Sequence, residues 1–203
     1  MSTSRQLLAT LSLAIPLSVM ADQALTQNNK APPPRREPTL VEQVQNGIDK
    51  SFFNPANALA RGWVNATACV SGPNEGAMGH HLVLPDSDPA KPPPNMVDGV
   101  LDPAHPEAFI YEPVGNNFFR LVGVEFIQLA DDWAGKFSRG EVSTPTPRVN
   151  GQLMNLVGTP NRYGLPAFYE LHVWAFENNP RGNFADFNTQ VTCNRAEPND
   201  LTR

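Results

Sequence analysis

Apolar side chains return every three or four residues in one stretch of the chain, which is the spacing of one face of a helix. These residues are Leu40, Val41, Val44, Ile48 and Phe52. The segment Thr39-Leu40-Val41-Glu42 has the form of a capping box, in which the Thr39 hydroxyl and the Glu42 carboxylate each satisfy a free backbone amide. We expect a helix of three to four turns that ends at Asn54-Pro55, and a shorter helical piece over 56–61.

Beyond this helix the apolar period falls to two, which is the spacing of strands. The candidate strands are 64–70, 80–84, 108–112, 118–129, 167–176 and 189–193. Gly115-Asn116-Asn117 tolerates positive φ and predicts a hairpin turn. The Pro- and Gly-rich stretches 87–95 and 138–160 are predicted to be long loops. The pattern as a whole predicts an α+β, mainly β domain, with an N-terminal helix packed on a curled or barrel-like antiparallel sheet.

The first residues have the composition of a secretory signal peptide. A single charge at Arg5 precedes an apolar run over 7–19, and Val19-Met20-Ala21 predicts cleavage after Ala21. This run is too short to span a bilayer permanently. Residues 22–38 hold too few apolar side chains to fold and predict a disordered, Pro-rich leader. Residues 39–203 remain as a single globular domain, so we expect a secreted or periplasmic protein.

Charge and cysteine content narrow the partners. The net charge is −5 and the Lys and Arg residues form no cluster, which argues against nucleic acid and anionic membranes as partners. No later segment has the length that membrane insertion requires. Cys69 and Cys193 are predicted to form a disulfide, since the chain is expected to enter an oxidising compartment. The alternatives are a pair of metal thiolates or two free thiols. Neither cysteine has a second Cys or a His two to four residues away, so a zinc-finger-like site has no local support.

Ionisable residues interrupt two otherwise apolar strands. By simple alternation, Glu125 shares a face with Leu121, Gly123 and Ile127. In the later strand Glu170, His172, Trp174 and Phe176 alternate onto one face. A carboxylate in such surroundings costs several kcal/mol unless a cation, a hydrogen-bond donor or a metal compensates it. A compensating group is therefore expected opposite Glu125.

Histidines supply that group in the simplest hypothesis. His80 and His81 are adjacent on a strand and should point to opposite sides, so that only one faces the interior. One of these two histidines, with Glu125 and His172, would then form a mononuclear site for a divalent metal such as zinc, iron, manganese or copper, with an open position for water or dioxygen. His81 lies further into the strand than His80, but alternation alone does not choose between them. The carboxylates of Glu112 and Glu107 are candidates for proton transfer beside it.

Two other functions remain open at this point. The same histidines and carboxylates could form buried pairs that fix strand register in a noncatalytic extracytoplasmic binding or scaffolding domain. Paired carboxylates among Glu107, Glu112, Glu125 and Glu170 could alternatively act on a saccharide, with Trp133 or Trp174 beside a groove. A small-molecule or saccharide ligand is thus a candidate partner. The chain has no Gly-x-Ser-x-Gly elbow and no phosphate-binding Gly-rich loop.

Five short motifs carry a resemblance to a known group of proteins. They are Ala77-Met78-Gly79-His80-His81, Pro106-Glu107-Ala108-Phe109-Ile110-Tyr111-Glu112-Pro113, Leu121-Val122-Gly123-Val124-Glu125-Phe126, Tyr169-Glu170-Leu171-His172-Val173-Trp174 and Asn179-Pro180-Arg181-Gly182-Asn183-Phe184-Ala185. The chain resembles, from about residue 62 to 193, a family of uncharacterised secreted bacterial proteins. The resemblance implies export and a common domain, and it implies that His81 is the relevant member of the histidine pair.

Overall fold

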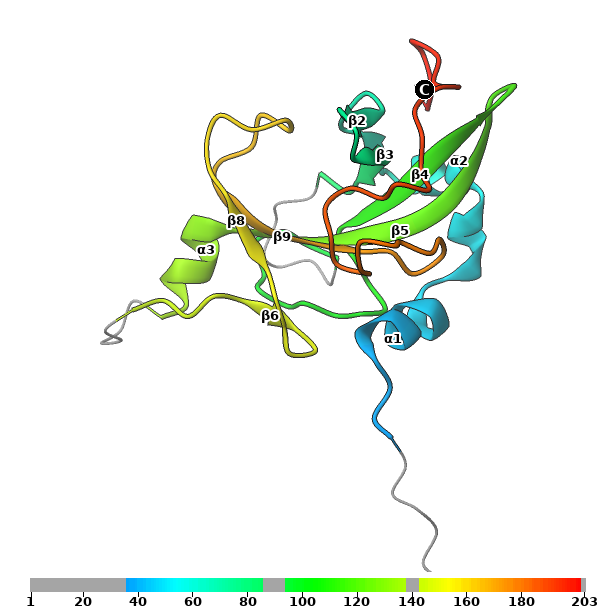
Figure 1. The fold of residues 1–203 in the computed structure, drawn as a ribbon. Coiled ribbons are helices and arrows are strands. Elements are labelled where there is room, and N and C mark those ends of the chain that lie inside the picture. The colour runs from blue at the N-terminus through cyan, green and yellow to red at the C-terminus, as the bar shows by residue number, and fades with distance from the viewer. Residues whose placement is uncertain (1–35, 86–93, 138–142, 202–203) are drawn as a thin grey trace, which may run out of the picture. The chain divides into compact units, whose positions relative to one another are not determined.

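The computed structural model describes residues 36–85, 94–137 and 143–201 (Figure 1). The predicted signal peptide and the predicted leader up to residue 35 lie outside these residues. Residues from Glu37 onward belong to one compact unit.

Helix α1, Leu40–Gly47, begins at the predicted capping box. The backbone N–H of Thr39 donates to Glu42 Oε2 at 2.7 Å, and the backbone N–H of Glu42 donates to Thr39 Oγ1 at 3.3 Å. The helix is shorter than predicted, because Ile48 is extended and the Asp49 side chain instead caps a separate 3-10 helix, η1, Lys50–Phe53. A carboxylate that binds nearby backbone amides competes in this way with helix continuation.

The second predicted helical piece is confirmed. Asn54 accepts a hydrogen bond from the backbone N–H of Ala56 and caps α2, Pro55–Ala60. One further short helix, α3, spans Ala130–Gly135. Among the described residues, no helix combines the length and the apolar character needed to cross a membrane.

The strands form an antiparallel sheet in the order β1-β3-β4-β5-β9-β8, with β2 also paired to β3. Their bounds are β1 Val64–Asn65, β2 Val70–Gly72, β3 Gly76–Val83, β4 Ala108–Gly115, β5 Phe118–Leu129, β8 Asn155–Val157 and β9 Phe168–Val173. The strands β6, Arg148–Val149, and β7, Gln152–Leu153, form a separate two-stranded sheet.

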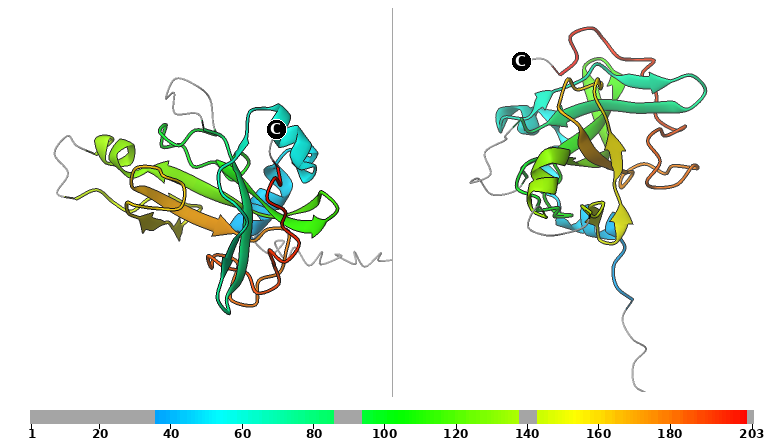
Figure 2. Two further views of the ribbon diagram at one scale, coloured as in Figure 1. Left: turned by 90° about the horizontal axis from the view of Figure 1, so that it is seen from above. Right: turned by 90° about the vertical axis from the view of Figure 1, so that its left-hand side faces the viewer.

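The α+β class and the antiparallel sheet are confirmed, whereas a barrel is not. The sheet is twisted but open, with β1 and β8 at its ends (Figure 2). The hairpin between β4 and β5 is also confirmed, because Gly115, Asn116 and Asn117 have φ of 93°, 53° and 58°. These residue types are the ones that adopt positive φ at low cost.

Several predicted boundaries are wrong. The predicted strand 64–70 survives only as β1 and the first residue of β2. In place of the predicted strand 189–193, residues 189–190 form a turn and 191–193 have no regular secondary structure. The predicted loop 138–160 contains β6, β7 and β8 in its later part, while 138–142 lies outside the described residues, as does most of the predicted loop 87–95. Strands of two or three residues are too short to leave a periodic signal.

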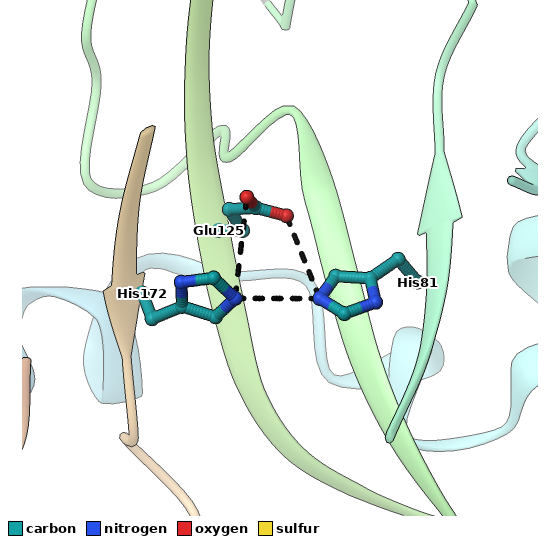
Figure 3. Close-up of side chains that lie close together, drawn as sticks. All are labelled: His81, Glu125 and His172. Atoms are coloured by element: carbon teal, nitrogen blue, oxygen red, sulfur yellow. Dashed lines mark hydrogen bonds and ion pairs between the residues drawn. The ribbon is translucent and has the colours of Figure 1, made fainter. Parts of the chain in front are cut away.

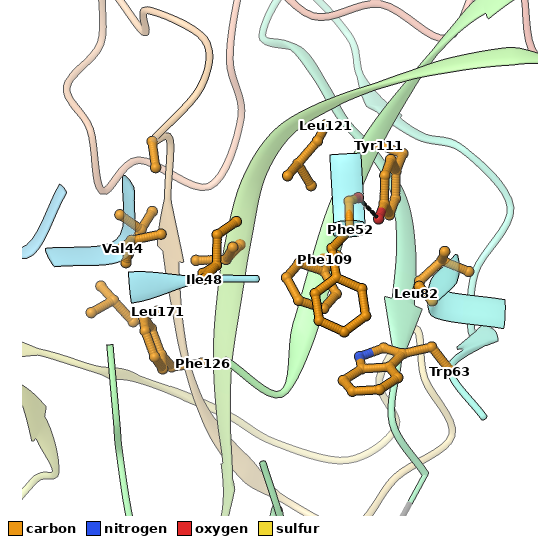
Figure 4. Packing of buried hydrophobic residues seen from close by; sticks show 14 of the residues in the cluster. Val44, Ile48, Phe52, Trp63, Leu82, Phe109, Tyr111, Leu121, Phe126 and Leu171 are labelled. Carbon is orange, nitrogen blue, oxygen red and sulfur yellow. Dashed lines mark hydrogen bonds between the residues drawn. The ribbon is translucent and has the colours of Figure 1, made fainter. Parts of the chain in front are cut away.

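One face of the sheet packs against the N-terminal helices (Figure 4). Val44 and Ile48 lie against Phe126 and Leu171, and the Phe52 ring stacks on Phe109 with centroids 4.4 Å apart. The Tyr111 hydroxyl donates to the backbone oxygen of Phe52 at 2.5 Å. This face therefore holds the main apolar core.

The opposite face carries two smaller apolar clusters. One contains Ala77, Ile110, Val122, Trp174 and Val191, and the other contains Val83, Met96, Ala108, Ile127 and Phe168. Because the β4–β5 register shifts between Ile110 and Tyr111, Leu121 joins the main core and does not share the face of Glu125, contrary to the alternation prediction. Phe176, beyond the end of β9, also packs on the main core. A bulge of this kind reverses the alternation.

The predicted disulfide is present. Cys69 and Cys193 are joined with Sγ atoms 2.08 Å apart, across a sequence separation of 124 residues. The bond ties the segment before β2 to the C-terminal segment, and Cys193 packs on the apolar cluster that contains Trp174.

We predict that replacing both cysteines with serine lowers the free energy of unfolding by up to about 5 kcal/mol, because the long loop is no longer closed in the unfolded chain. Urea denaturation of the wild type and the C69S/C193S variant measures this difference. The wild type under reducing conditions should match the variant. Equal stability of oxidised wild type and variant would contradict the prediction.

Candidate metal centre

The sheet register places two of the predicted site residues directly opposite each other. Glu125 on β5 pairs with His172 on β9, and on its other side Glu125 pairs with Ala108 on β4. His81 lies on β3, which is separated from β5 by β4. His81 and Glu125 therefore approach each other diagonally across β4, which presents Ala108 opposite Glu125 and Ile110 opposite His81. A side chain larger than the methyl group of Ala108 would crowd the Glu125 carboxylate.

Figure 3 shows the side chains of His81, Glu125 and His172 pointing toward one another. The two Nε2 atoms of the histidines lie 3.3 Å apart. Glu125 Oε2 lies 3.6 Å from His81 Nε2, and Glu125 Oε1 lies 4.0 Å from His172 Nε2. All three side chains are buried, with 0–1 % of their surface exposed. The structure thus brings together the three residues predicted as metal ligands.

The geometry and the donor types fit a divalent metal ion. Two donor atoms on a tetrahedral zinc ion lie about 3.4 Å apart, which matches the distance between the two imidazole nitrogens. The distances from these nitrogens to the carboxylate are slightly longer. Glu125 Oε1 is also buried without a hydrogen-bond donor among the described residues. These three residues form a group that could hold a metal ion.

Two neighbouring residues cover the carboxylate. The Tyr163 hydroxyl donates to Glu125 Oε2 at 2.6 Å. Arg162 Nη2 donates to Glu170 Oε2 at 2.6 Å and lies 3.5 Å from Glu125 Oε1. Glu170 and His172 are two residues apart on β9, so both reach the same face of the sheet. Glu125 therefore belongs to a polar network that already holds one cation.

Burial controls the protonation of this cluster. Desolvation lowers the pKa of His172 to about 3, with a smaller contribution from the Arg162 guanidinium. Desolvation, followed by the proximity of His172, holds the pKa of His81 well below its usual range. Desolvation and the nearby Glu170 raise the pKa of Glu125. Both imidazoles are therefore neutral at physiological pH, which is the form that binds metal.

The outer nitrogens of the two histidines have different neighbours. Thr67 Oγ1 lies 3.3 Å from His81 Nδ1, a contact that can fix the tautomer with Nε2 free to bind. His172 Nδ1 has no hydrogen-bond partner among the described residues, and its nearest carboxylate oxygen is Oδ1 of the half-exposed Asp186, at 3.9 Å. Glu170, His172 and Asp186 form a second group of donor atoms that could hold an ion.

The two adjacent histidines do point to different surroundings, but both are buried. His80 is 2 % exposed, and its Nε2 lies 3.3 Å from Asp200 Oδ2 while its ring packs edge-on against Phe119. The prediction that only one of the pair would face the interior is therefore wrong. The C-terminal segment that contains Asp200 covers the other side of β3, and alternation along one strand cannot reveal such a cover.

The structure does not bring Glu112 or Glu107, the predicted catalytic carboxylates, into the cluster. Glu112 accepts hydrogen bonds from Arg120 and from the backbone N–H of Thr192. Glu107 is 1 % exposed, and its Oε2 accepts from the backbone N–H of Ile127 at 3.0 Å. Neither belongs to the two groups of metal-donor atoms found among the described residues.

The saccharide hypothesis loses one of its two aromatic residues. Trp174 is 2 % exposed and its Nε1 donates to the backbone oxygen of Ala185, so its ring has almost no exposed surface on which a sugar could stack. The Trp133 Nε1 donates to the backbone oxygen of Pro145. A buried tryptophan of this kind serves packing.

Arg162 and Tyr163 are the residues of the network that sequence analysis missed. They lie in the Pro- and Gly-rich connection between β8 and β9, where no periodic pattern marks a buried position. The only available signal was the expectation that a cation or donor must lie opposite Glu125. That expectation does not identify which residue supplies it.

Comparisons with known proteins assign neither a family nor a function to the chain. No family model matches the chain, and neither the characterised proteins nor the solved structures contain a match.

We predict that Glu107→Gln removes a pH-dependent loss of stability. Burial raises the pKa of Glu107 well above its ordinary value of 4.5. The folded protein thus holds a proton that the unfolded chain releases, and stability falls as pH rises from 4.5 to the folded pKa, by about 1.4 kcal/mol per pH unit. Urea denaturation between pH 5 and 8 should show a flatter profile for E107Q than for the wild type. Parallel profiles would contradict the assignment.

Proposed function

We propose that the protein binds one divalent transition-metal ion through His81 Nε2, His172 Nε2 and a carboxylate oxygen of Glu125. The observation that carries the proposal is the convergence of two neutral imidazole nitrogens, 3.3 Å apart, on a buried carboxylate. Two imidazoles and one carboxylate suit zinc, iron, manganese or copper. A bound cation would also compensate Glu125 Oε1, which lacks a hydrogen-bond donor among the described residues.

The burial of the three donors favours a site that admits only small ligands. With three protein ligands, the ion keeps a position for water or another small molecule such as dioxygen. The Tyr163 hydroxyl, which holds Glu125 Oε2, is the nearest described group that could exchange a proton with the carboxylate. Activation of water or dioxygen at this centre is the reaction class that we propose, and metal binding is its prerequisite.

The disulfide supports a location outside the cytoplasm. A bond between Cys69 and Cys193 persists in an oxidising compartment. Together with the predicted signal peptide, it supports the proposal of a secreted or periplasmic protein. The proposed membership of the uncharacterised secreted family rests on the five sequence motifs given above.

A second function is favoured by the network around Glu125. Arg162 and Tyr163 already contact this carboxylate, so the cluster can also act as a metal-free polar network that fixes the packing of the β8–β9 connection on the sheet. The protein would then be a noncatalytic binding or scaffolding domain. The two functions differ in whether stoichiometric metal is bound.

We predict that untagged protein binds about one equivalent of Zn²⁺ and that His81→Ala and His172→Ala each weaken binding at least 100-fold. Isothermal titration after chelator treatment measures the affinity. Zn²⁺ should also raise the melting temperature of the wild type, because it binds only the folded state.

His80→Ala is the matched control, since His80 is adjacent, equally buried and outside the cluster. H80A should bind Zn²⁺ as the wild type does even where its stability falls. Absence of binding by the wild type, or equal affinity of H81A and H80A, would exclude the metal site and leave the polar network.

A further inference from the structure

The charges around Glu125 are arranged in a way that the proposed metal does not explain. Arg162 is one-quarter exposed, yet its guanidinium reaches inward to two buried carboxylates, those of Glu170 and Glu125. Its Cζ also lies 4.8 Å from the centre of the Tyr163 ring. Both hydrogen-bonded and ionic contacts hold the guanidinium beside the position that a metal ion would occupy.

The net charge of this cluster determines how strongly it attracts a metal ion. A carboxylate that binds a metal must be deprotonated, so the site that receives the ion carries the charges of Glu125, Glu170 and Arg162, which sum to one net negative charge, and a divalent ion brings the total to +1. Without Arg162 the loaded cluster would be neutral. Asp186 is 46 % exposed, so solvent screens most of its contribution. Two cations within a few ångströms repel each other strongly in a buried site.

We propose that Arg162 is a built-in competitor of the metal ion, holding the Glu125 carboxylate in the empty protein and setting the affinity of the site. This inference rests on the proposed metal function. Glu170 provides the alternative partner for the guanidinium, because the Arg162–Glu170 contact of 2.6 Å is the closer of the two. Loading the site breaks the 3.5 Å Arg162–Glu125 contact and leaves Arg162 with Glu170.

The competition also explains why Glu125 has two kinds of partner. Oε2 is held by the neutral Tyr163 hydroxyl, which does not need to leave when an ion arrives. Oε1 instead forms ionic contacts with the Arg162 guanidinium at 3.5 Å and with the His172 ring at 4.0 Å. The oxygen that faces Arg162 is therefore the one released for the metal.

The test compares Zn²⁺ affinities at pH 8, measured by competition with a chromophoric chelator. Arg162→Met keeps an aliphatic chain over Tyr163 and removes the charge, so we expect Zn²⁺ to bind at least about tenfold more tightly. Arg162→Lys keeps the charge and should bind within a few-fold of the wild type. Arg162→Gln provides a second neutral variant in case R162M folds poorly.

Glu170→Gln should have the opposite effect, because it removes a negative charge and leaves Glu125 as the single anion facing Arg162. The double variant R162M/E170Q restores the wild-type charge and should return the affinity to near the wild-type value. Arg120→Met is the matched control. Arg120 also pairs with a buried carboxylate, Glu112, but outside both groups of metal-donor atoms in the described part of the chain.

The outcomes separate the inference from the function on which it rests. Tighter binding by R162M and R162Q, with R120M unchanged, supports the competition. Zn²⁺ binding by the wild type with equal or weaker binding by both neutral variants overturns the competition and leaves the metal site intact. Absence of Zn²⁺ binding by the wild type and by both neutral variants overturns the metal site and the competition together.

Discussion

A fully buried carboxylate on the sheet is the constraint on which the rest of this structure depends. Glu125 has no exposed surface, and its polar partners come from other segments: His81 from β3, His172 from β9, and Arg162 and Tyr163 from the β8–β9 connection. An isolated ionised carboxylate at this position would cost several kcal/mol. The fold must therefore supply partners, and the partners define the candidate centre.

The strand order makes this convergence possible. His81 and Glu125 are separated by a whole strand, and their side chains meet over β4, where the small Ala108 lies opposite Glu125 and Ile110 lies opposite His81. The same face of the sheet holds two small apolar clusters with this polar group between them. The main core lies on the other face, against α1, η1 and α2. The main apolar core and the candidate metal centre thus lie on different faces of one sheet.

Among the described residues, the one cation beside Glu125 in this network is a guanidinium and not an imidazolium. Arg162 supplies the positive charge, while the two imidazoles stay neutral because burial disfavours their protonation. Neutral imidazoles with inward-facing nitrogens are ready to bind an ion but do not themselves compensate a negative charge. This combination distinguishes the cluster from a simple His–Glu ion pair, in which the histidine would carry the charge.

The sequence by itself determined the local features. Thr39 and Glu42 set the start of α1, Gly115-Asn116-Asn117 set the β4–β5 hairpin, and the polar residues in β5 and β9 marked the face of the site. Each of these depends on neighbours within a few residues or on strand periodicity. The need to compensate one carboxylate also grouped Glu125 with His172 and with one of the two adjacent histidines, and the resemblance selected His81 from that pair.

Only the tertiary structure decided the remainder. The Asp49 cap that shortens α1 and the bulge that moves Leu121 to the main core are set by competing local contacts and by pairing register. The burial of His80 depends on Asp200, which is 120 positions further along the chain. Arg162 and Tyr163 reach Glu125 from an aperiodic connection. Such contacts join residues distant in sequence, and the strand order that brings them together leaves no mark on local periodicity.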